Sequence, residues 1–336
     1  MRVTIAGAGI GGLTLAAHLA EHDVVVLERR PRPMGIGAGL LLHDEALGAL
    51  RQGGVELTGR PFHRFDLGLA NGRLLPGVRR TGLAIRRPDL HEALLQATRA
   101  EVRGGTTVRS FTERSDHVQV TTSAGDTLEV DVLVGADGLG STTRQQLGAP
   151  GRRRYSGATC WRGLTSVECP TDQPVELWGD GTRVGLIPLV GGTYLYLTST
   201  EPEGSDRPTP PIERFQHFAF EAPAMIDSVS RWSHHDLAEL DLHHFGTARV
   251  PLLGDAAHGF TPNLGEGAAQ AILDAAHLAQ ALRGASEYPG PRRGKNWRIA
   301  TASRFVGHIG QASGPTAWLR DRVVTVIGAG TRWVSA

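Results

Sequence analysis

The chain contains four short, largely apolar runs, and each is followed by a glycine or an acidic residue. They cover residues 3–6, 24–27, 132–134 and 250–253. Apolar character sustained over so few residues predicts strands that are buried on both faces, as in a parallel sheet. Between the first two runs, apolar residues at helical spacing predict a helix over residues 13–21. The chain is therefore expected to open with a β-α-β unit.

The pattern changes further along the chain. Residues 106–129 contain an alternating stretch followed by a turn, which predicts short antiparallel strands. Asn71-Gly72 lies between apolar stretches and predicts a hairpin. From about residue 151 to 245 the chain is strand-like and rich in aromatic residues, with a helical patch at 215–220. This character predicts a mostly antiparallel sheet inserted between parts of the first unit.

Helical periodicity recurs in four further segments, and a loop is expected over residues 284–294. These helices are expected over residues 44–52, 87–100, 265–282 and 296–310. The fold class is thus α/β, with a Rossmann-like domain, an inserted mostly antiparallel sheet domain and C-terminal helices. The expected division is 1–150 for the first part of the Rossmann-like domain, 151–245 mainly for the inserted domain, 246–285 for the return of the first domain, and 286–336 for the C-terminal helical segment.

Composition narrows the class of protein. The 336 residues carry 35 basic and 34 acidic side chains, so a net charge of +1 gives no reason to expect nucleic acid or an anionic membrane as partner. No apolar run reaches the ~18 residues that a membrane span needs. The two cysteines, Cys160 and Cys169, form no disulfide framework and no metal-ligand spacing. The absence of a disulfide framework is typical of a protein in the reducing cytoplasm. Glycines at 7, 9, 11 and 12 would break the apolar helix of a signal peptide, so we expect a cytoplasmic protein.

The first chemical motif is Gly7-x-Gly9-x-x-Gly12, with Gly11 inside it, between the first strand and the first helix. The first glycine permits the tight turn, the second lets the backbone approach a pyrophosphate, and the third allows the helix to pack closely on the strand. Glu28, followed by Arg29, ends the next strand and is placed to accept hydrogen bonds from a ribose. A similar run at residues 326–330 has too few residues after it to build such a unit, so it is not a site.

Two further motifs follow buried strands. One is Asp137-Gly138-x-x-Ser141-x-x-Arg144, and the other is Gly254-Asp255-Ala256-Ala257-His258, which continues through Pro262 to Gly265-x-Gly267. Either motif alone is compatible with a capped strand-to-helix turn, with Asp255 only a helix cap. The combination of all three motifs, in this order, is a far more specific signal than any one of them alone.

In this combination the sequence resembles the FAD-dependent aromatic hydroxylases of the p-hydroxybenzoate hydroxylase type, the single-component flavoprotein monooxygenases, over nearly its whole length. The resemblance implies that the first glycine turn and Glu28 bind the ADP part of FAD. It implies that Asp137 serves FAD and the nicotinamide cofactor, and that Asp255 contacts the ribityl region. The remaining positions that the resemblance assigns to FAD are Gly35, Gly37 and Gly39 near the flavin, Arg87 of an R-x-x-L helix start, Val108 near the adenine, and Pro262, Gly265, Gly267 and Ala268 at the flavin ring.

Three positions depart from the family pattern. Gly259 replaces a usual proline, Ala269 a common asparagine and Glu266 a common glutamine. All three are expected beside the flavin, so they bear on its tuning more than on its binding. The helix that begins near Gly265 is expected to direct its N–H groups at the flavin pyrimidine ring.

The resemblance implies that NADPH or NADH acts as a transient reductant, and that O2 then forms a flavin C4a-hydroperoxide. One oxygen atom would pass to a small aromatic or polyketide-like substrate, in a monomer or homodimer. Two alternatives remain open: an FAD oxidoreductase that inserts no oxygen, and a flavoprotein whose FAD is structural and whose pocket performs a non-redox step.

No acid or base is assigned from the sequence. Arg162 and His43 are candidates to approach a substrate, although a strand-surface residue and a helix-start residue are the simpler interpretations. His258 is interpreted as a structural hydrogen-bonding residue. Trp161 and Arg162 belong to a Trp-Arg-Gly run that, with Pro188, matches family landmarks. Trp161, Trp178 and Tyr194 are explained equally well as substrate walls and as sheet packing.

Overall fold

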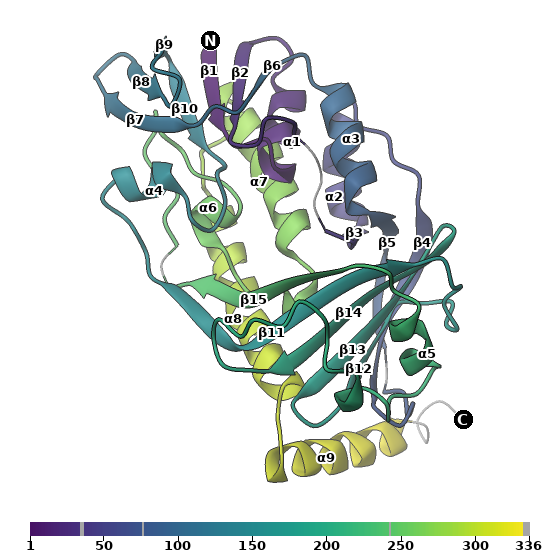
Figure 1. Ribbon diagram of the computed structural model, residues 1–336. Helices are drawn as coiled ribbons and strands as arrows, with labels where there is room; N and C mark the ends of the chain where they lie inside the picture. Colours follow the sequence, from purple (N-terminus) through teal and green to yellow (C-terminus); the bar gives the residue numbers. More distant parts are fainter. Residues whose placement is uncertain (34–36, 76, 242, 332–336) are drawn as a thin grey trace.

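The computed structural model describes residues 1–33, 37–75, 77–241 and 243–331 and contains three sheets with helices between and beside them (Figure 1). Gly35, which was expected near the flavin, lies outside the described residues. Among the described residues, no helix is both long and apolar enough to span a bilayer.

A four-stranded parallel sheet forms one end of the molecule, in the order β10-β1-β2-β6. Its strands are β1 (Arg2–Ala6), β2 (Asp23–Glu28), β6 (Glu101–Gly104) and β10 (Val132–Gly135). The apolar run at 250–253 extends this sheet beside β10: Gly135 N–H donates to Pro251 O and Leu253 N–H donates to Gly135 O. That run forms isolated bridges rather than a full strand. The predicted β-α-β unit is confirmed.

The helix α1 (Ile10–His18) packs behind β1, and every one of its nine residues is buried. It contacts α3 (Arg87–Ala97) and α7 (Gly267–Leu282), and α7 also contacts α2 (Asp44–Gln52). A helix without a polar face must lie inside the core, which here is built from segments far apart in sequence. Compared with the predictions, α1 starts earlier, α3 ends earlier and α7 starts two residues later.

The eight-stranded sheet has the order β15-β11-β14-β13-β12-β4-β5-β3 and is antiparallel except where β12 pairs parallel with β4. Its strands are β3 (Gly39–His43), β4 (Arg60–Leu69), β5 (Val78–Arg86), β11 (Arg153–Thr165), β12 (Val175–Trp178), β13 (Thr182–Leu189), β14 (Gly192–Thr200) and β15 (Trp232–Leu240). The mostly antiparallel sheet is confirmed, and the predicted hairpin turn at Asn71-Gly72 follows β4. Residues 1–150 supply strands to both the four-stranded and the eight-stranded sheet. The domain boundary at residue 150 stays a prediction.

The outer face of the large sheet is covered by α5 (Ala222–Asp227), whose apolar side chains share one buried cluster with Trp161 and Phe215. The short helix η1 (Ile212–Arg214) directly precedes Phe215. The helical patch predicted at 215–220 is wrong. Phe220 and Glu221 have φ values of 58° and 55°, which interrupt any helix at that point, so helical turns form only before and after the patch.

A small sheet and the C-terminal helices complete the molecule. They comprise β7 (Val108–Glu113), β8 (Val118–Thr122), β9 (Thr127–Val130), α4 (Thr142–Gln146), α6 (Asp255–His258), η2 (Pro262–Leu264), α8 (Arg292–Gly310) and α9 (Pro315–Thr331). The predicted strands at 106–129 are confirmed. Helix α8 begins within the predicted loop, and α9, which contains the glycines of residues 326–330, was not predicted. In Figure 1, α9 lies at the end of the molecule opposite β1.

Candidate cofactor and substrate site

The first glycine turn is shaped by close packing at two of its positions. Gly7 has φ +109°, and a Cβ there would lie 2.5 Å from Ala136 O. A Cβ at Gly12 would overlap the carbonyl oxygen of Gly7. A Cβ at Gly9, in contrast, would meet no protein atom within 4 Å. Gly7 and Gly12 are thus required by the turn itself, while Gly9 leaves open space at the N-terminus of α1, where a pyrophosphate fits.

Glu28 is held in place at the end of β2. Its Oε2 accepts a 3.0 Å hydrogen bond from the N–H of Ala8, and its Oε1 accepts a 3.0 Å bond from the N–H of Arg30. Each carboxylate oxygen has a second lone pair left. The side chain is therefore oriented by the glycine turn and retains the capacity to accept bonds from two ribose hydroxyls.

A groove of about 310 Å³ runs past both features. It is lined by Ala8, Gly9, Ile10, Glu28, Arg30, Gly37, Arg87, His91, Arg162, Ser233 and His235. One wall comes from the carboxyl ends of the parallel strands and the other from β11 and β15 of the large sheet. Arg29, a sequence candidate, is exposed, and its neighbour Arg30 lines the groove instead.

Arg87 is the first residue of α3 and extends into this groove. Burial lowers the pKa of its guanidinium, and the carboxylate of Asp255 partly opposes that shift. Among the described residues, no carboxylate oxygen lies within 4 Å of its nitrogens. A Cβ at Gly37 would lie 3.1 Å from Arg87 Cδ, so the loop passes directly over the arginine. A half-buried cation without a carboxylate partner fits an anionic cofactor.

Asp137 is engaged within its own loop. Its Oδ1 accepts a 2.5 Å bond from Ser141 Oγ, and its Oδ2 accepts bonds from the N–H and Oγ1 of Thr143 at 3.0 and 3.1 Å. Arg144, only 2% exposed, donates to Ala256 O at 2.9 Å and so joins this loop to the Gly-Asp motif. The structure gives Asp137 an organising role, and direct contact with a cofactor stays a prediction.

The Gly-Asp motif places a carboxylate at the start of a short helix. Gly254 has φ +58°, a left-handed conformation that favours glycine, and it turns the chain into α6. The Asp255 side chain is exposed to solvent. Burial raises the pKa of this carboxyl, while His258 and Arg87 act in the opposite direction. A solvent-accessible carboxylate at this turn is compatible with the polar ribityl chain of FAD.

Asp274 of α7 lies behind this motif and is fully buried. It accepts hydrogen bonds from Gly254 N–H (3.1 Å), His258 Nε2 (2.5 Å), Arg292 Nε (2.8 Å) and Asn296 Nδ2 (3.1 Å). The carboxylate therefore connects the motif, α7 and α8. His258 is a structural hydrogen-bonding residue, as the sequence indicated.

The N-terminus of α7 follows η2 and Gly265, whose φ is +65°. Helical geometry begins at Gly267-Ala268, after Glu266. Glu266 is bound by Arg80, and His43 Nε2 lies 3.4 Å from its Oε2. Burial would raise the pKa of Glu266, but His43, Arg80 and Gln270 outweigh it and hold the value at about 2. Two basic side chains thus balance the carboxylate that departs from the family pattern.

The other two departures have packing explanations. A Cβ at Gly259 would be in close contact with Leu139, and a larger residue there would need Leu139 to move. Ala269 is fully buried in the core between α7 and its neighbours.

The face of the large sheet that lies toward the parallel unit is lined by alternate residues of each strand. Tyr194 packs closely against β3, where a Cβ at Gly39 would lie 2.6 Å from its Cγ. Arg162 lies in the groove wall rather than on the outer surface. Trp161 points the opposite way: it is fully buried and donates to Arg207 O at 2.7 Å. For Trp161, sheet packing is therefore the correct interpretation.

The same face carries a buried polar network that the sequence analysis missed. Glu176, 4% exposed, accepts bonds of 2.6 Å from Trp178 Nε1 and Tyr196 OH. Arg183, 2% exposed, lies 3.5 Å from Glu176 and donates to Asn263 Oδ1 of η2 at 2.8 Å. Charged residues within the apolar strands β12 and β13 were the available signal. The network connects the sheet to the segment that precedes α7.

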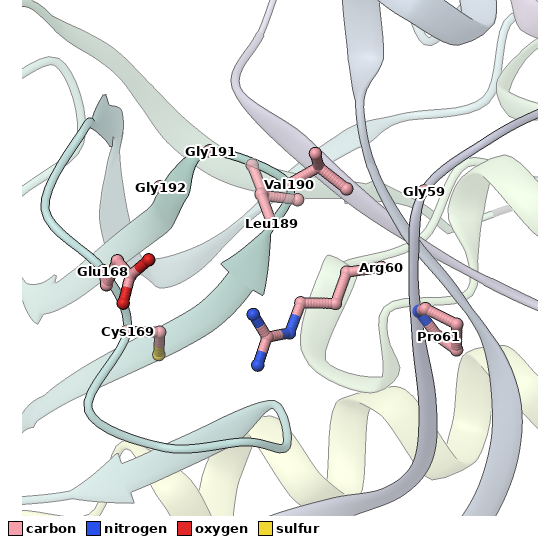
Figure 2. Close-up of a pocket in the computed structure, with 9 residues that line it drawn as sticks. All are labelled: Gly59, Arg60, Pro61, Glu168, Cys169, Leu189, Val190, Gly191 and Gly192. Carbon is pink, nitrogen blue, oxygen red and sulfur yellow. The ribbon is translucent and has the colours of Figure 1, made fainter.

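A second hollow of about 420 Å³ lies at the β13–β14 turn and the start of β4. Figure 2 shows Arg60 and Cys169 lining it with Leu189 and Val190. It contains none of the predicted site residues. Among the described residues, no group of three or more His, Cys, Asp or Glu side chains is arranged to hold a metal ion.

Comparisons with known proteins agree with this geometry. The FAD binding domain model matches residues 84–304, and a model of the NAD(P)-binding Rossmann-like domain matches residues 5–39. The chain is 32% identical to aurachin C monooxygenase/isomerase of Stigmatella aurantiaca and 33% identical to 2-heptyl-3-hydroxy-4(1H)-quinolone synthase of Pseudomonas aeruginosa. Each alignment covers 97% of this chain and 94% of the relative.

Solved structures show the same fold. Klebsiella pneumoniae HpxO complexed with FAD and uric acid superposes with a TM-score of 0.79 at 22% identity, over 98% of this chain and 96% of that one. Pseudomonas aeruginosa PqsL, a probable FAD-dependent monooxygenase, gives 0.79 at 24% identity, over 97% and 99%. With the motifs and the groove described above, these matches show that the chain belongs to the FAD-dependent aromatic hydroxylases, the single-component flavoprotein monooxygenases that use NAD(P)H.

Proposed function

We propose that this monooxygenase transfers one oxygen atom from O2 to a small aromatic metabolite, and that a 4-quinolone is the first substrate class to test. The observation that carries the proposal is the similarity to the Pseudomonas 2-heptyl-3-hydroxy-4(1H)-quinolone synthase, which extends over 97% of the chain. That span includes the large sheet, whose inner face would meet the substrate. A related 3-hydroxybenzoate 6-hydroxylase, 31% identical, supports the broader aromatic class.

The site residues would hold FAD along the groove. Gly9 and the N-terminus of α1 face the pyrophosphate, Glu28 accepts the ribose hydroxyls, and Arg87 supplies a positive charge. Asp255 accepts hydrogen bonds from the ribityl hydroxyls. The N–H groups that begin α7 at Gly267 meet the flavin ring, where a helix N-terminus favours negative charge. Bound flavin supplies the redox and oxygen chemistry, and the protein supplies placement and exclusion of water.

Four other predicted contacts complete this proposal. Val108 is the first residue of β7 and is buried in the same apolar cluster as Leu27, which fits a position near the adenine. Pro262 begins η2 and Gly265 follows it, while Ala268 follows Gly267 at the start of α7.

The substrate would lie between the flavin and the inner face of the large sheet. Tyr194 offers an aromatic surface there, and Arg162 offers a positive charge that favours a carbonyl, phenolate or enolate oxygen. We propose both as substrate-facing residues. A monomer or homodimer in the cytoplasm is the corresponding expectation.

Turnover with a panel of aromatic compounds tests the proposal. The purified protein is expected to be yellow, and NADH or NADPH oxidation should rise when a 4-quinolone or hydroxybenzoate is added. The product should be heavier by one oxygen atom, and labelled O2 should supply that atom. A product formed without O2, or one that gains no oxygen from it, would contradict the proposed reaction. Oxygen insertion into hydroxybenzoates alone would reject the quinolone class.

A further inference from the structure

Large apolar side chains are exposed on the two C-terminal helices. On α8, Trp297 is 61% and Phe305 is 65% exposed. On α9, Trp318 and Leu319 are each 57% exposed and Val323 is 49% exposed. Among the described residues, every strongly exposed tryptophan or phenylalanine lies on α8 or α9. Their restriction to two successive helices needs an explanation, although single exposed apolar residues are ordinary.

The attachment of α9 directs this apolar face outward. Arg320, on the inner side, is 7% exposed and donates to Gly179 O at 2.9 Å and to Gly310 O at 3.1 Å. Ala317, 4% exposed, packs on the same inner side. With these two residues fixed against the body, Trp318 and its neighbours face solvent. The helix therefore buries an arginine and presents large apolar residues to water.

The charge of this region differs sharply from that of the rest of the chain. Residues 292–336 contain eight arginines and lysines and one acidic residue, a net charge of +7, while residues 1–291 carry a net charge of −6. Arg293, Arg298 and Arg322 are exposed, and no carboxylate among the described residues lies within 4 Å of them. Arg322 lies 4.2 Å above the ring of Trp318. The overall value of +1 conceals this asymmetry.

We propose that the outer faces of α8 and α9 dock on an anionic lipid membrane surface. Exposed tryptophan, phenylalanine and leucine beside arginine are the residues that an interfacial helix inserts among lipid headgroups. Anionic lipids then attract the arginines. A second copy of the chain is the competing occupant, but it would bring two surfaces of the same positive sign together. The charge therefore favours the membrane, which the protein contacts without spanning it.

Co-sedimentation of the FAD-loaded protein with vesicles tests this inference without reference to turnover. Vesicles of phosphatidylcholine are compared with vesicles that also contain phosphatidylglycerol, at low ionic strength and at about 0.5 M salt, where the Debye length is only a few Å. The apolar variant, W318S/L319S, removes two exposed apolar side chains of α9. Its matched control is V78S, because Val78 is an apolar residue that is 56% exposed on β5. The charge variant is R298E/R322E, matched by R51E on α2.

The protein is expected to bind the phosphatidylglycerol vesicles, to be released by salt, and to bind phosphatidylcholine weakly. Each arginine removed should weaken binding about fivefold, so R298E/R322E should lose at least roughly 30-fold. The apolar variant should lose at least about tenfold, and both matched controls should bind like the parent.

Three outcomes would overturn the inference. One is absence of binding to anionic vesicles at low salt. Another is equal binding to both vesicle types that the arginine substitutions leave unchanged. The third is a dimer in light scattering that W318S/L319S dissociates, without any vesicle binding, because a second copy would then cover this face.

Discussion

Replacing Asp274 by asparagine removes one buried charge with almost no change of shape. The carboxylate is fully buried and accepts bonds from Gly254, His258, Arg292 and Asn296. An amide can accept on one side only, so its NH2 group would face donors on the other. The guanidinium of Arg292 would lose its buried counter-ion. Breaking a buried ion pair in this way costs about 3–5 kcal/mol, a large share of the 5–15 kcal/mol typical of a folded protein.

Urea denaturation of the FAD-loaded protein measures this cost. Asp274→Asn should lower the free energy of unfolding by about 3 kcal/mol or more. It should also weaken FAD binding, because Asp274 fixes the N–H of Gly254 beside Asp255. Arg292→Met and the double variant complete a double-mutant cycle, in which the two changes should couple by about 1–3 kcal/mol. A loss below about 1 kcal/mol for Asp274→Asn, or strictly additive losses, would refute the role assigned to the pair.

The same carboxylate predicts a dependence of stability on pH. Burial raises the pKa of Asp274, but His258 and Arg292 outweigh burial and hold the value at about 2. This folded-state pKa is below the unfolded value of about 3.9, so the group stabilises the fold fully above about pH 4. That contribution is lost as the pH falls toward 2, and acid titration of Asp274→Asn should lack it.

Four further substitutions test the cofactor groove. Gly12→Ala should destabilise the protein by about 3 kcal/mol or more, because its Cβ overlaps the backbone of Gly7. Gly9→Ala should instead fold normally and lose FAD affinity, as seen by thermal melting and flavin fluorescence titration; equal behaviour of the two variants would contradict the roles given to the glycines. Glu28→Gln should weaken FAD binding by about tenfold or more, with little change in the stability of the apoprotein, through loss of charged acceptors for the ribose. Arg87→Met should weaken FAD binding to a similar extent, and an unchanged dissociation constant at low salt would show that the cation does not serve the cofactor.

The local units of the fold could be predicted from the sequence. The first β-α-β unit combines a short apolar run, a glycine turn and a helix, and all of its signals lie within 28 residues. The parallel pairing of β12 with β4 could not be predicted, because it joins strands about 110 residues apart. Pairing at that distance depends on tertiary packing, which leaves no local pattern.

The site was predictable where the backbone determines it. Gly7, Gly9 and Glu28 lie where a strand-turn-helix motif must place them. Glu176 and Arg183 were missed because a charged residue in an apolar strand does not reveal which face it occupies or what pairs with it. Averaging over the whole chain also concealed information, since a net charge of +1 described neither the acidic body nor the basic C-terminal helices.

Helix α1 has a consequence for the protein while it is being synthesised. All nine of its residues are buried, and much of its cover comes from α7, which ends at Leu282. At 5–20 residues per second, a ribosome needs roughly 10–50 s to deliver that cover after α1 has emerged. During this interval an apolar helix without a polar face is available to chaperones or to aggregation, and a chain that stops before α7 never buries it. We therefore expect the yield of this enzyme in a host cell to depend on chaperone capacity.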